Sequence, residues 1–457
     1  MTDTVYDMVV LGAGSGGYAA ALRGAQLGLR VALIEADKVG GTCLHRGCVP
    51  TKALLHAAET ADAVRGARAL GVDAELRGVD MAALNAYKDS IVTRMHKGLQ
   101  GLVASRGIDL IAGRGRLAAS DAVEVDGRAV RGRNIVLATG SYSKTLGQRI
   151  DDRVLTSEGA LRLERVPASA VVLGGGVIGV EFASAWASLG ARVTIVEALP
   201  RLVPGEDEAV SKQLERAFRK RRIAVRTNTM FESVERHDDG VTVHTQDGKT
   251  HDAEVMLIAV GRGPVTADLG YEQAGVAMDR GFVTTDGFGR TSVPGVWAVG
   301  DIVPGVQLAH RGFAQGIVVA ERIAGLDPAP VDDALVPRVT FCEPEIASVG
   351  LTEARARQAH GADAVTTAEF NVAGNAKSQI LGTQGFVKLV SLKDGPIVGF
   401  HAIGARMGEQ VGEGQLIVNW EADADDVAAL VHAHPTQNET LGEAAMALAG
   451  KPLHNHG

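Results

Sequence analysis

The amino-acid sequence predicts an α/β protein with two Rossmann-like dinucleotide-binding domains followed by a C-terminal α+β domain. Three observations lead to this prediction: the chain has 457 residues, 57 of them are glycine, and a strand–glycine–helix–strand pattern occurs twice. At ~100–200 residues per domain, the length corresponds to about three domains. The abundant glycine suits the tight turns and close backbone approaches of nucleotide-binding α/β folds.

The composition excludes several classes of protein. With 46% hydrophobic and 22% charged residues, the chain is too apolar and too weakly charged to stay disordered. Its net charge of -8 would repel a nucleic-acid backbone or an anionic lipid surface, so we expect neither partner. We expect no signal peptide or membrane span. The 3 cysteines are too few for a disulfide framework and favour a cytoplasmic location.

The first βαβ unit is predicted within residues 5–35. The apolar run Val5–Leu11 reads as a buried parallel strand, and a helix follows over Tyr18–Gln26. A second strand, Arg30–Ile34, ends in Glu35. The turn between the first strand and the helix contains Gly12, Gly14 and Gly17.

The same pattern returns near residue 170. A strand over Ala170–Leu173 precedes a helix over Val180–Leu189, and the strand Arg192–Val196 ends in Glu197. The turn contains Gly174, Gly176 and Gly179. From the first glycine to the acid, the spacing is 23 residues in both copies (35 − 12 and 197 − 174). The repeat predicts two domains of one design.

A single GxGxxG is a weak signal, because a tight strand–helix turn without a ligand has the same glycines. Here the turns follow strands and open helices, whose N-terminal amides can hold a pyrophosphate, and the later acid can bind ribose hydroxyls. Two copies therefore predict two dinucleotides. Glu197 favours NAD over NADP because a carboxylate repels a 2′-phosphate, although Arg201 nearby leaves NADP open.

The rest of the chain completes these domains and adds another. Apolar strands over Asn134–Leu137 and Val255–Val260 each end at a small-residue turn, and the later sequence VPGVWAVGD returns to the first domain. After Arg338, strands over Phe386–Ser391 and Ile397–Ile403 precede helices, which are predicted over Met407–Trp420 and Thr436–Ala449. We expect domains at 1–148 and 149–267, a segment at 268–335 returning to the first domain, and an α+β domain at 336–457.

Two cysteines lie in the sequence GGTCLHRGCVPTK, residues 40–52. Cys43 and Cys48 could be buried reduced thiols, whereas zinc is disfavoured because no second ligand pair has suitable spacing. A redox pair is the stronger interpretation. A helix start favours a thiolate, and a disulfide there can be attacked at one sulfur while the other leaves.

The sequence HAHPTQNE, residues 432–439, contains a candidate base. A histidine, with an ordinary pKa near ~6.5, can accept a proton from a thiol, and a carboxylate can fix its tautomer. His434 and Glu439 are the candidates for this pair. Two histidines two residues apart are otherwise more often cap or core residues, and we expect His432 to be only a structural neighbour.

With both glycine motifs, the CxxxxC segment, WAVGD and HAHPTxxE, essentially the whole chain resembles the flavin-dependent pyridine nucleotide-disulphide oxidoreductases. Within that family it is most similar to the dihydrolipoyl dehydrogenases. The resemblance implies FAD at the first glycine turn, NAD at the second, and a C-terminal dimerisation domain. It also implies a homodimer whose partner subunit completes each active site. The lipoyl group would come from a lipoyl domain of a 2-oxo acid dehydrogenase complex or from a glycine cleavage protein.

The resemblance also implies residue roles, and no metal. The expected FAD contacts are Gly12, Gly14, Gly17, Glu35, Thr42, Lys52, Thr139, Gly140, Asp301 and His310. The expected NAD contacts are Gly174, Gly176, Gly179, Glu181, Glu197 and Gly261. Lys52 would pair with Glu181, although Glu181 alone could be an ordinary surface acid.

In the implied reaction, His434 deprotonates a dihydrolipoyl thiol, which attacks the sulfur of Cys43, and Cys48 becomes the thiolate beside the flavin. His45 and Gln437 depart from the common family pattern and weaken the expectation about substrate choice.

One alternative function is that of an NAD(P)H-dependent reductase of a small disulfide of the glutathione or mycothiol type. Another is a redox sensor or scaffold that binds FAD with little turnover. Cys342 is expected to be a small buried hydrophobe.

Overall fold

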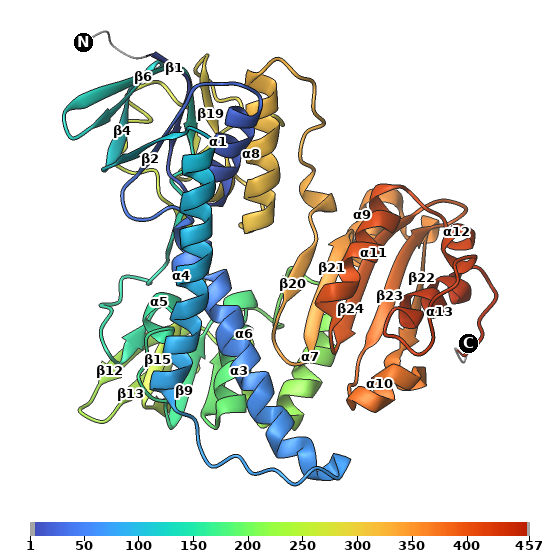
Figure 1. Cartoon of the computed structure of the whole chain (residues 1–457). Coiled ribbons are helices and arrows are strands. Elements are labelled where there is room, and N and C mark those ends of the chain that lie inside the picture. Colours follow the sequence, from blue (N-terminus) through green and yellow to red (C-terminus); the bar gives the residue numbers. More distant parts are fainter. Residues whose placement is uncertain (1–4, 455–457) are drawn as a thin grey trace. The chain divides into compact units, whose positions relative to one another are not determined.

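The computed structural model describes residues 5–454, which form two compact units. The first unit combines residues 5–54, 82–144 and 262–333, and the second combines 55–81, 145–261 and 334–454. Figure 1 labels the helices and strands of both units. The expectation of an α/β fold is confirmed, since both units pair sheets with helices.

The first unit is built on a mainly parallel sheet in the order β3–β2–β1–β6–β5–β4, with β19 also beside β6. The parallel strands are β1 Val5–Leu11, β2 Val31–Glu35, β3 Asp109–Ala112, β6 Arg128–Leu137 and β19 Val296–Ala298. Antiparallel strands β4 Gly115–Ala119 and β5 Ala122–Val125 extend one edge. The ends of β1 and β6, residues 8–11 and 135–137, and most of β2 are apolar because both faces of the sheet are covered there.

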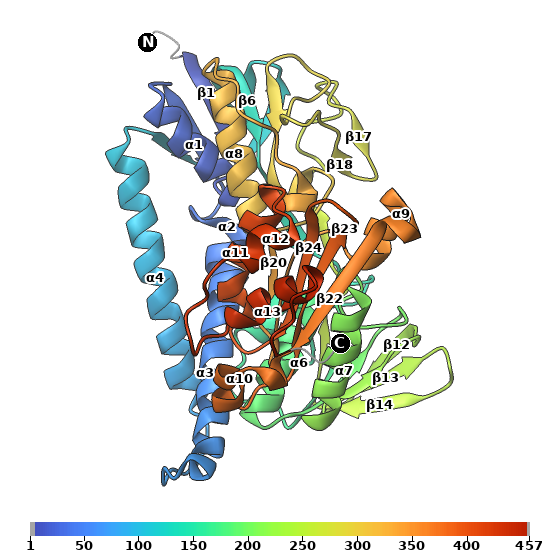
Figure 2. The ribbon, with the colours of Figure 1, turned by 90° about the vertical axis from the view of Figure 1, so that its right-hand side faces the viewer.

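Helices α1 Ser15–Gln26 and α8 Ala309–Ile323 lie side by side on one face of this sheet (Figures 1 and 2). Their backbones are in close contact, since a Cβ on Gly316 would lie 2.3 Å from the carbonyl oxygen of Gly16. Helix α1 begins three residues before the expected Tyr18. Gly14 is its N-cap. A side chain has no room on Gly16 or Gly17, because an added Cβ would meet the Val299 side chain or the Gly12 carbonyl oxygen.

Further elements of the first unit are α2 Gly41–Arg46, α4 Met81–Ser105, β7 Ser141–Ser143, β16 Arg262–Pro264, β17 Met278–Asp279 and β18 Phe282–Val283. Helix α3 Cys48–Gly66 starts in the first unit and ends in the second.

The second unit contains a parallel sheet in the order β11–β10–β9–β15–β8. Its strands are β8 Val154–Leu155, β9 Ser169–Leu173, β10 Arg192–Val196, β11 Ala224–Arg226 and β15 Val255–Ile258. The helices are α5 Ser157–Ala160, α6 Val177–Leu189 and α7 Glu208–Lys220. An antiparallel meander follows, with β12 Phe231–Arg236, β13 Val241–Thr245 and β14 Thr250–Ala253 (Figure 2).

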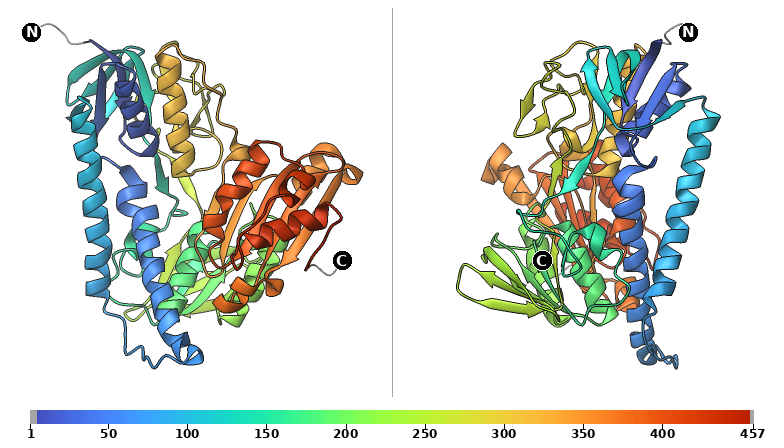
Figure 3. Two further views of the ribbon diagram at one scale, coloured as in Figure 1. Left: turned by 45° about the vertical axis from the view of Figure 1, so that its right-hand side comes forward. Right: turned by 90° about the vertical axis from the view of Figure 1, so that its left-hand side faces the viewer.

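The C-terminal part of the second unit is an antiparallel sheet in the order β20–β21–β24–β23–β22. Its strands are β20 Arg338–Thr340, β21 Glu345–Gly350, β22 Val365–Asn371, β23 Phe386–Leu392 and β24 Ile397–Gly404. The helices are α9 Glu353–His360, α10 Ala376–Leu381, α11 Met407–Asn419, α12 Ala424–Ala428 and α13 Glu439–Leu448. Helices α11 and α13 cover one face of the sheet and share a buried apolar core with it (Figure 3).

The last helix begins at Glu439 rather than at the expected Thr436. The Thr436 hydroxyl donates to the Ala433 carbonyl oxygen, and the Thr436 N–H donates to the Glu439 carboxylate. These bonds form a turn ahead of the helix, which keeps the Glu439 side chain beside residues 434–436. Among residues 5–454, no helix is long and apolar enough to cross a bilayer.

Candidate active site

The first glycine turn leaves an open space at the N-terminus of α1. Gly12 has φ +102°, and a Cβ on Gly17 would lie only 1.8 Å from the Gly12 carbonyl oxygen. An added Cβ on Gly14, by contrast, meets no atom within 4 Å. The backbone is therefore packed tightly below the turn and open above it, as a pyrophosphate bound to the helix amides requires.

The second glycine turn repeats this geometry at α6. Gly174 has φ +105°, and a Cβ on Gly179 would lie 1.9 Å from the Gly174 carbonyl oxygen. A Cβ on Gly176, the N-cap of α6, again meets nothing within 4 Å. Both turns thus fit a dinucleotide, and the fit has the same physical basis in each.

The glutamate that follows each glycine turn stabilises that turn through hydrogen bonds. The Glu35 carboxylate accepts hydrogen bonds from the N–H groups of Ala13 at 2.7 Å and Asp37 at 2.8 Å. The Glu197 carboxylate accepts them from Gly175 at 2.5 Å and Leu199 at 2.7 Å. Each carboxylate is thus held against its glycine turn, where a ribose would lie. The repeated spacing suggested the ligand role of these acids but not their bonds to the turn.

A second group of polar residues in the first unit surrounds Asp301. Its carboxylate accepts a hydrogen bond from the Ser141 hydroxyl at 2.5 Å, and Arg262 Nε donates to the same hydroxyl at 2.7 Å. The Thr139 hydroxyl donates to the Val265 carbonyl oxygen at 2.6 Å. Ser141 belongs to no recognisable motif and could not be predicted from the sequence. Arg262 was expected in the turn close to NAD, and the structure instead bonds it to Ser141 beside Asp301.

Three other residues expected to contact the cofactors are Gly140, Gly261 and His310. Gly140 and Gly261 have φ values of +77° and +105°, and an added Cβ on either meets nothing within 4 Å. His310 is exposed in the first turn of α8.

The two cysteines lie on consecutive helices at the first glycine turn. Cys43 is in α2, and Cys48 is the first residue of α3. The Gly40 N–H donates to the Ala13 carbonyl oxygen at 2.8 Å, and a Cβ on Gly41 would lie 2.7 Å from Gly14 Cα. The cysteine segment, which includes Thr42, is therefore packed directly on the turn expected to hold FAD.

A side-chain hydrogen bond links the thiols of Cys43 and Cys48. A hydrogen bond with Cys48 and, second, burial raise the pKa of the Cys43 thiol, while the charge of Lys52 acts in the opposite direction. The Cys43 thiol therefore keeps its proton more firmly than an ordinary thiol does. Burial first, and then the electrostatic effect of Cys43, raise the pKa of Tyr18 to about 12.

In the second unit, His434 and Glu439 form a dyad. His434 Nδ1 lies 2.8 Å from Glu439 Oε1, and the Thr436 N–H donates to Glu439 Oε2 at 2.8 Å. Burial opposes ionisation of Glu439, but these hydrogen bonds outweigh it and hold its pKa below the ordinary value. The His434 side chain is 71% exposed, so its other ring nitrogen, Nε2, can exchange a proton with a substrate.

A parallel pair lies beside this dyad. His432 Nε2 is 2.8 Å from Glu413 Oε1 on α11, and Asn438 Nδ2 donates to Glu413 Oε2 at 2.5 Å. The hydrogen bond to Glu413, against the opposing effect of burial, raises the pKa of His432. His432 is therefore a structural neighbour that ties the segment carrying His434 to α11.

The structure also shows the surroundings of four further residues that the sequence singled out. Glu181 is 2% exposed and accepts a hydrogen bond from the Phe341 N–H at 2.9 Å, so it is not a surface acid. Cys342 is buried, as expected. Gln437 is buried as well, where it accepts from Ser378 and donates to Ala405. His45 Nε2 lies 2.9 Å from the Val39 carbonyl oxygen.

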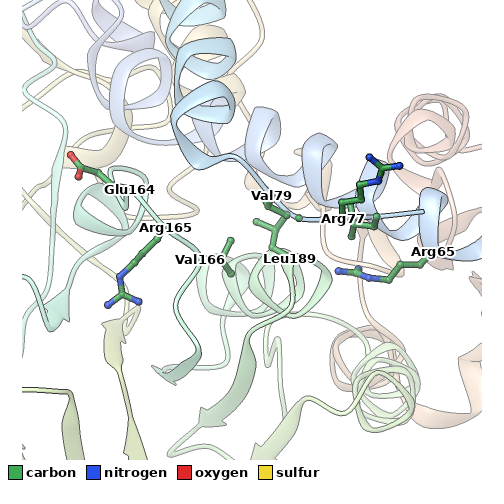
Figure 4. Close-up of a pocket in the computed structure, with 9 residues that line it drawn as sticks. Arg65, Arg77, Val79, Glu164, Arg165, Val166 and Leu189 are labelled. Atoms are coloured by element: carbon green, nitrogen blue, oxygen red, sulfur yellow. The ribbon is translucent and has the colours of Figure 1, made fainter. Parts of the chain in front are cut away.

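A depression of about 500 Å³ lies elsewhere in the second unit (Figure 4). Val79, Val166 and Leu189 lie at its centre, and Arg65 and Arg165 lie on opposite sides. None of the sequence-predicted site residues lines it. The candidate chemistry therefore depends on the glycine turns, the cysteine segment and the His434 dyad.

Comparison with known proteins identifies the family. Residues 6–316 match the pyridine nucleotide-disulphide oxidoreductase model, and residues 336–445 match the dimerisation domain of the same family. A dihydrolipoyl dehydrogenase of Bacillus subtilis is 39% identical, covering 98% of this chain and 97% of its own. A dihydrolipoyl dehydrogenase of Geobacillus stearothermophilus is 38% identical with the same coverage.

Solved structures agree with the family match. LpdA from Mycobacterium tuberculosis has a TM-score of 0.90 at 28% identity, covering 96% of this chain and 99% of its own. The HOCl-induced flavoprotein disulfide reductase RclA from Escherichia coli has a TM-score of 0.86 at 28% identity with the same coverage.

The chain belongs to the pyridine nucleotide-disulphide oxidoreductases. It is a flavin-dependent oxidoreductase whose curated relatives above are dihydrolipoyl dehydrogenases, so the resemblance expected from the sequence is confirmed. Its cofactors are FAD and NAD, and its C-terminal dimerisation domain supports a homodimer.

Proposed function

We propose that this enzyme oxidises protein-bound dihydrolipoyl groups with NAD⁺, using Cys43 and Cys48 as its redox disulfide. The observation that carries the proposal is the packing of the cysteine segment on the first glycine turn, where Gly41 approaches Gly14. A redox pair built into the wall of a flavin site can accept electrons from a dithiol substrate on one side and pass them to the flavin on the other.

The residues proposed for each cofactor follow from the two turns. The first turn, with Glu35, Asp301 and Lys52, would hold FAD, and the second, with Glu197 and the Gly261 turn, would hold NAD. When bound, FAD would supply an acceptor for the electron pair, and NAD⁺ would supply the final acceptor of hydride. We further propose that the domains end at residues 148, 267 and 335. We also propose a cytoplasmic location for the protein.

The protein's own groups move the protons and sulfur bonds. His434 Nε2 would take a proton from one substrate thiol, while Glu439 fixes the ring through Nδ1. The resulting thiolate attacks the sulfur of Cys43, the Cys43–Cys48 bond breaks, and Cys48 leaves as a thiolate. The second substrate thiol then displaces Cys43, which releases the oxidised disulfide of the substrate and leaves the enzyme with two reduced sulfurs.

We further propose that each active site takes its cysteines from one subunit and His434 from the other. The physiological substrate would be the lipoyl domain of a 2-oxo acid dehydrogenase complex or a glycine cleavage protein. A small dithiol, dihydrolipoamide, carries the same reacting group and tests the chemistry without the partner.

The decisive experiment is steady-state reduction of NAD⁺ and, separately, of NADP⁺ by the FAD-loaded enzyme with dihydrolipoamide. We expect rapid turnover with NAD⁺ and little with NADP⁺, because the carboxylate of Glu197 repels a 2′-phosphate. Failure with dihydrolipoamide, together with NAD(P)H-driven reduction of a glutathione-type or mycothiol-type disulfide, would contradict the proposed substrate.

A further inference from the structure

The segment that follows Glu197 packs on the second glycine turn. The Val203 N–H donates to the Gly175 carbonyl oxygen at 2.8 Å, and the Leu202 side chain is fully buried against the same glycine. Val203 has φ +41°, a conformation that a β-branched residue adopts only when its surroundings enforce it. Some neighbouring structure must therefore hold residues 198–207 in place.

The far end of this segment enters a buried ionic cluster in the C-terminal sheet. Lys388 Nζ, on β23, lies 2.9 Å from Asp207 Oδ1 and 2.6 Å from Glu353 Oε2. The Glu353 N–H donates to Asp207 Oδ2 at 3.0 Å, which adds a second connection to the same carboxylate. The Ser348 hydroxyl, on β21, donates to Glu206 at 2.5 Å.

Burial makes this cluster sensitive to the loss of any one charge. Lys388 is 7% exposed and Asp207 is 3% exposed. Burial disfavours the charge on each, but their mutual hydrogen bond and the one to Glu353 outweigh it, so the pKa of Lys388 is raised and that of Asp207 is lowered. Removing Lys388 would leave the buried Asp207 carboxylate without the lysine that it pairs with, while Glu353 would keep Arg357, whose Nε lies 2.9 Å away. The loss of a buried partner is far costlier than the loss of a surface ion pair.

We propose that Lys388 is a positioning residue for NAD: through Asp207 it holds residues 198–207 against the Gly175 turn, so that the C-terminal domain controls the affinity of the NAD site. The inference rests on the proposed function, specifically on the assignment of NAD to the second glycine turn. It goes beyond that assignment because Lys388 lies in a different domain and does not belong to any dinucleotide motif.

Lys388 affects NAD affinity by keeping the second glycine turn ordered before the dinucleotide binds. Without Lys388, the buried Asp207 carboxylate lacks its lysine partner, the start of α7 is displaced, and Val203 relaxes away from Gly175. Binding a dinucleotide then has to reorder the turn, and that cost appears as weaker affinity. The chemical step is unaffected once the site is filled.

The test compares Lys388→Met with Lys212→Met in the FAD-loaded enzyme. Lys212 is the matched control, because it lies on α7 and forms an exposed ion pair with Glu208 at 2.7 Å. Isothermal titration calorimetry measures the affinity for NAD⁺ and for ADP-ribose, which lacks the nicotinamide. We expect Lys388→Met to weaken both by roughly fivefold or more, a typical coupling between distinct sites. The control should match the wild type, and kcat at saturating NAD⁺ should be preserved.

Unchanged affinity in Lys388→Met would overturn the proposal, as would equal losses in Lys388→Met and Lys212→Met. If Lys388→Met does not fold with bound FAD, Asp207→Asn replaces it. Asparagine keeps the N-cap of α7 but removes the negative partner of Lys388. Weaker ADP-ribose binding in Asp207→Asn supports the proposal, and unchanged binding rejects it.

Gly176→Val separates failure of this inference from failure of the proposed NAD site. If Gly176→Val still binds ADP-ribose as the wild type does, the assignment of NAD to the second turn is wrong and the Lys388 proposal is overturned with it. Loss of binding in Gly176→Val, with unchanged binding in Lys388→Met, rejects the Lys388 proposal alone.

Discussion

At the scale of single residues, Gly14 and Gly176 differ from the other motif glycines of their turns. Both have φ values that any residue can adopt, −72° and −76°, and an added Cβ on either meets no protein atom. Valine at these positions would therefore leave the fold intact and occupy the space of the pyrophosphate.

We predict opposite losses from these two substitutions. Gly14→Val should give a folded protein without the yellow absorbance of FAD, whereas Gly176→Val should retain FAD and lose NAD⁺ binding. Absorbance spectra and calorimetric titration with NAD⁺ check both expectations. Retention of full FAD occupancy in Gly14→Val would contradict the FAD assignment of the first turn.

Cys48→Ser tests the redox pair. The substitution should preserve FAD binding, because Cys48 lies at the start of α3 rather than in the glycine turn. It should abolish dihydrolipoamide turnover, since the remaining Cys43 cannot form the intramolecular disulfide. Cys342→Ser is the control for the number of cysteines. It should leave turnover intact, because a serine hydroxyl can donate to the Pro344 carbonyl oxygen as the Cys342 thiol does. Normal activity in Cys48→Ser would show that the cysteine pair is not the redox centre.

The geometry of the His434–Glu439 dyad predicts which of two substitutions lowers kcat more. His434→Ala removes the base and should lower kcat by roughly 10²–10⁴-fold, the usual range for general acid–base catalysis. Glu439→Ala should lower it less, because the carboxylate only orients and supports the ring. Rates with dihydrolipoamide, measured across pH, check the order. A larger loss in Glu439→Ala would mean that the two roles are wrongly assigned.

At the scale of elements, the His432–Glu413 pair ties the segment before α13 to α11. The pKa of His432 is raised, so the ion pair contributes stability that is fully present below the unfolded histidine pKa of ~6.5 and is lost as pH rises through the folded value. The pKa of Glu413 is lowered despite burial, so the same contribution is lost again as pH falls through the folded pKa of this carboxyl.

Glu413→Gln is therefore expected to destabilise the fold most between these two limits, by about 1–3 kcal/mol for a partly buried, charge-assisted hydrogen bond. Thermal melts of the wild type and the variant across pH measure the difference. The difference should shrink when pH rises above the folded pKa of His432. A destabilisation that stays constant over the whole pH range would exclude the ionic origin.

At the scale of the whole molecule, the proposed sharing of active sites can be tested by mixing two inactive variants. One chain carries His434→Ala with its cysteines intact, and the other carries Cys48→Ser with His434 intact. If each site combines cysteines of one subunit with His434 of the other, a mixed dimer has one complete site. We expect mixed dimers, purified with two different affinity tags, to regain about half of the wild-type turnover. No recovery would place His434 and the cysteines of each site in the same chain.

The sequence by itself determined the repeated βαβ units and their glycine turns, because these depend on local patterns. Apolar runs select buried strands, and a glycine is needed wherever the backbone takes a positive φ or approaches its neighbour, as at Gly12 and Gly174. The short separation of Cys43 and Cys48, and of His434 and Glu439, likewise made each pair recognisable before any contact was known.

Only the tertiary structure decided which distant residues support those motifs. Arg262 meets Ser141 across 121 positions, and Lys388 meets Asp207 across 181, so no local periodicity could reveal either contact. The start of the last helix differs, because it depends on a local bond: the Thr436 N–H donates to the Glu439 carboxylate, in a turn that precedes the helix. The distant contacts depend on packing and burial, which the order of residues encodes only through the complete fold.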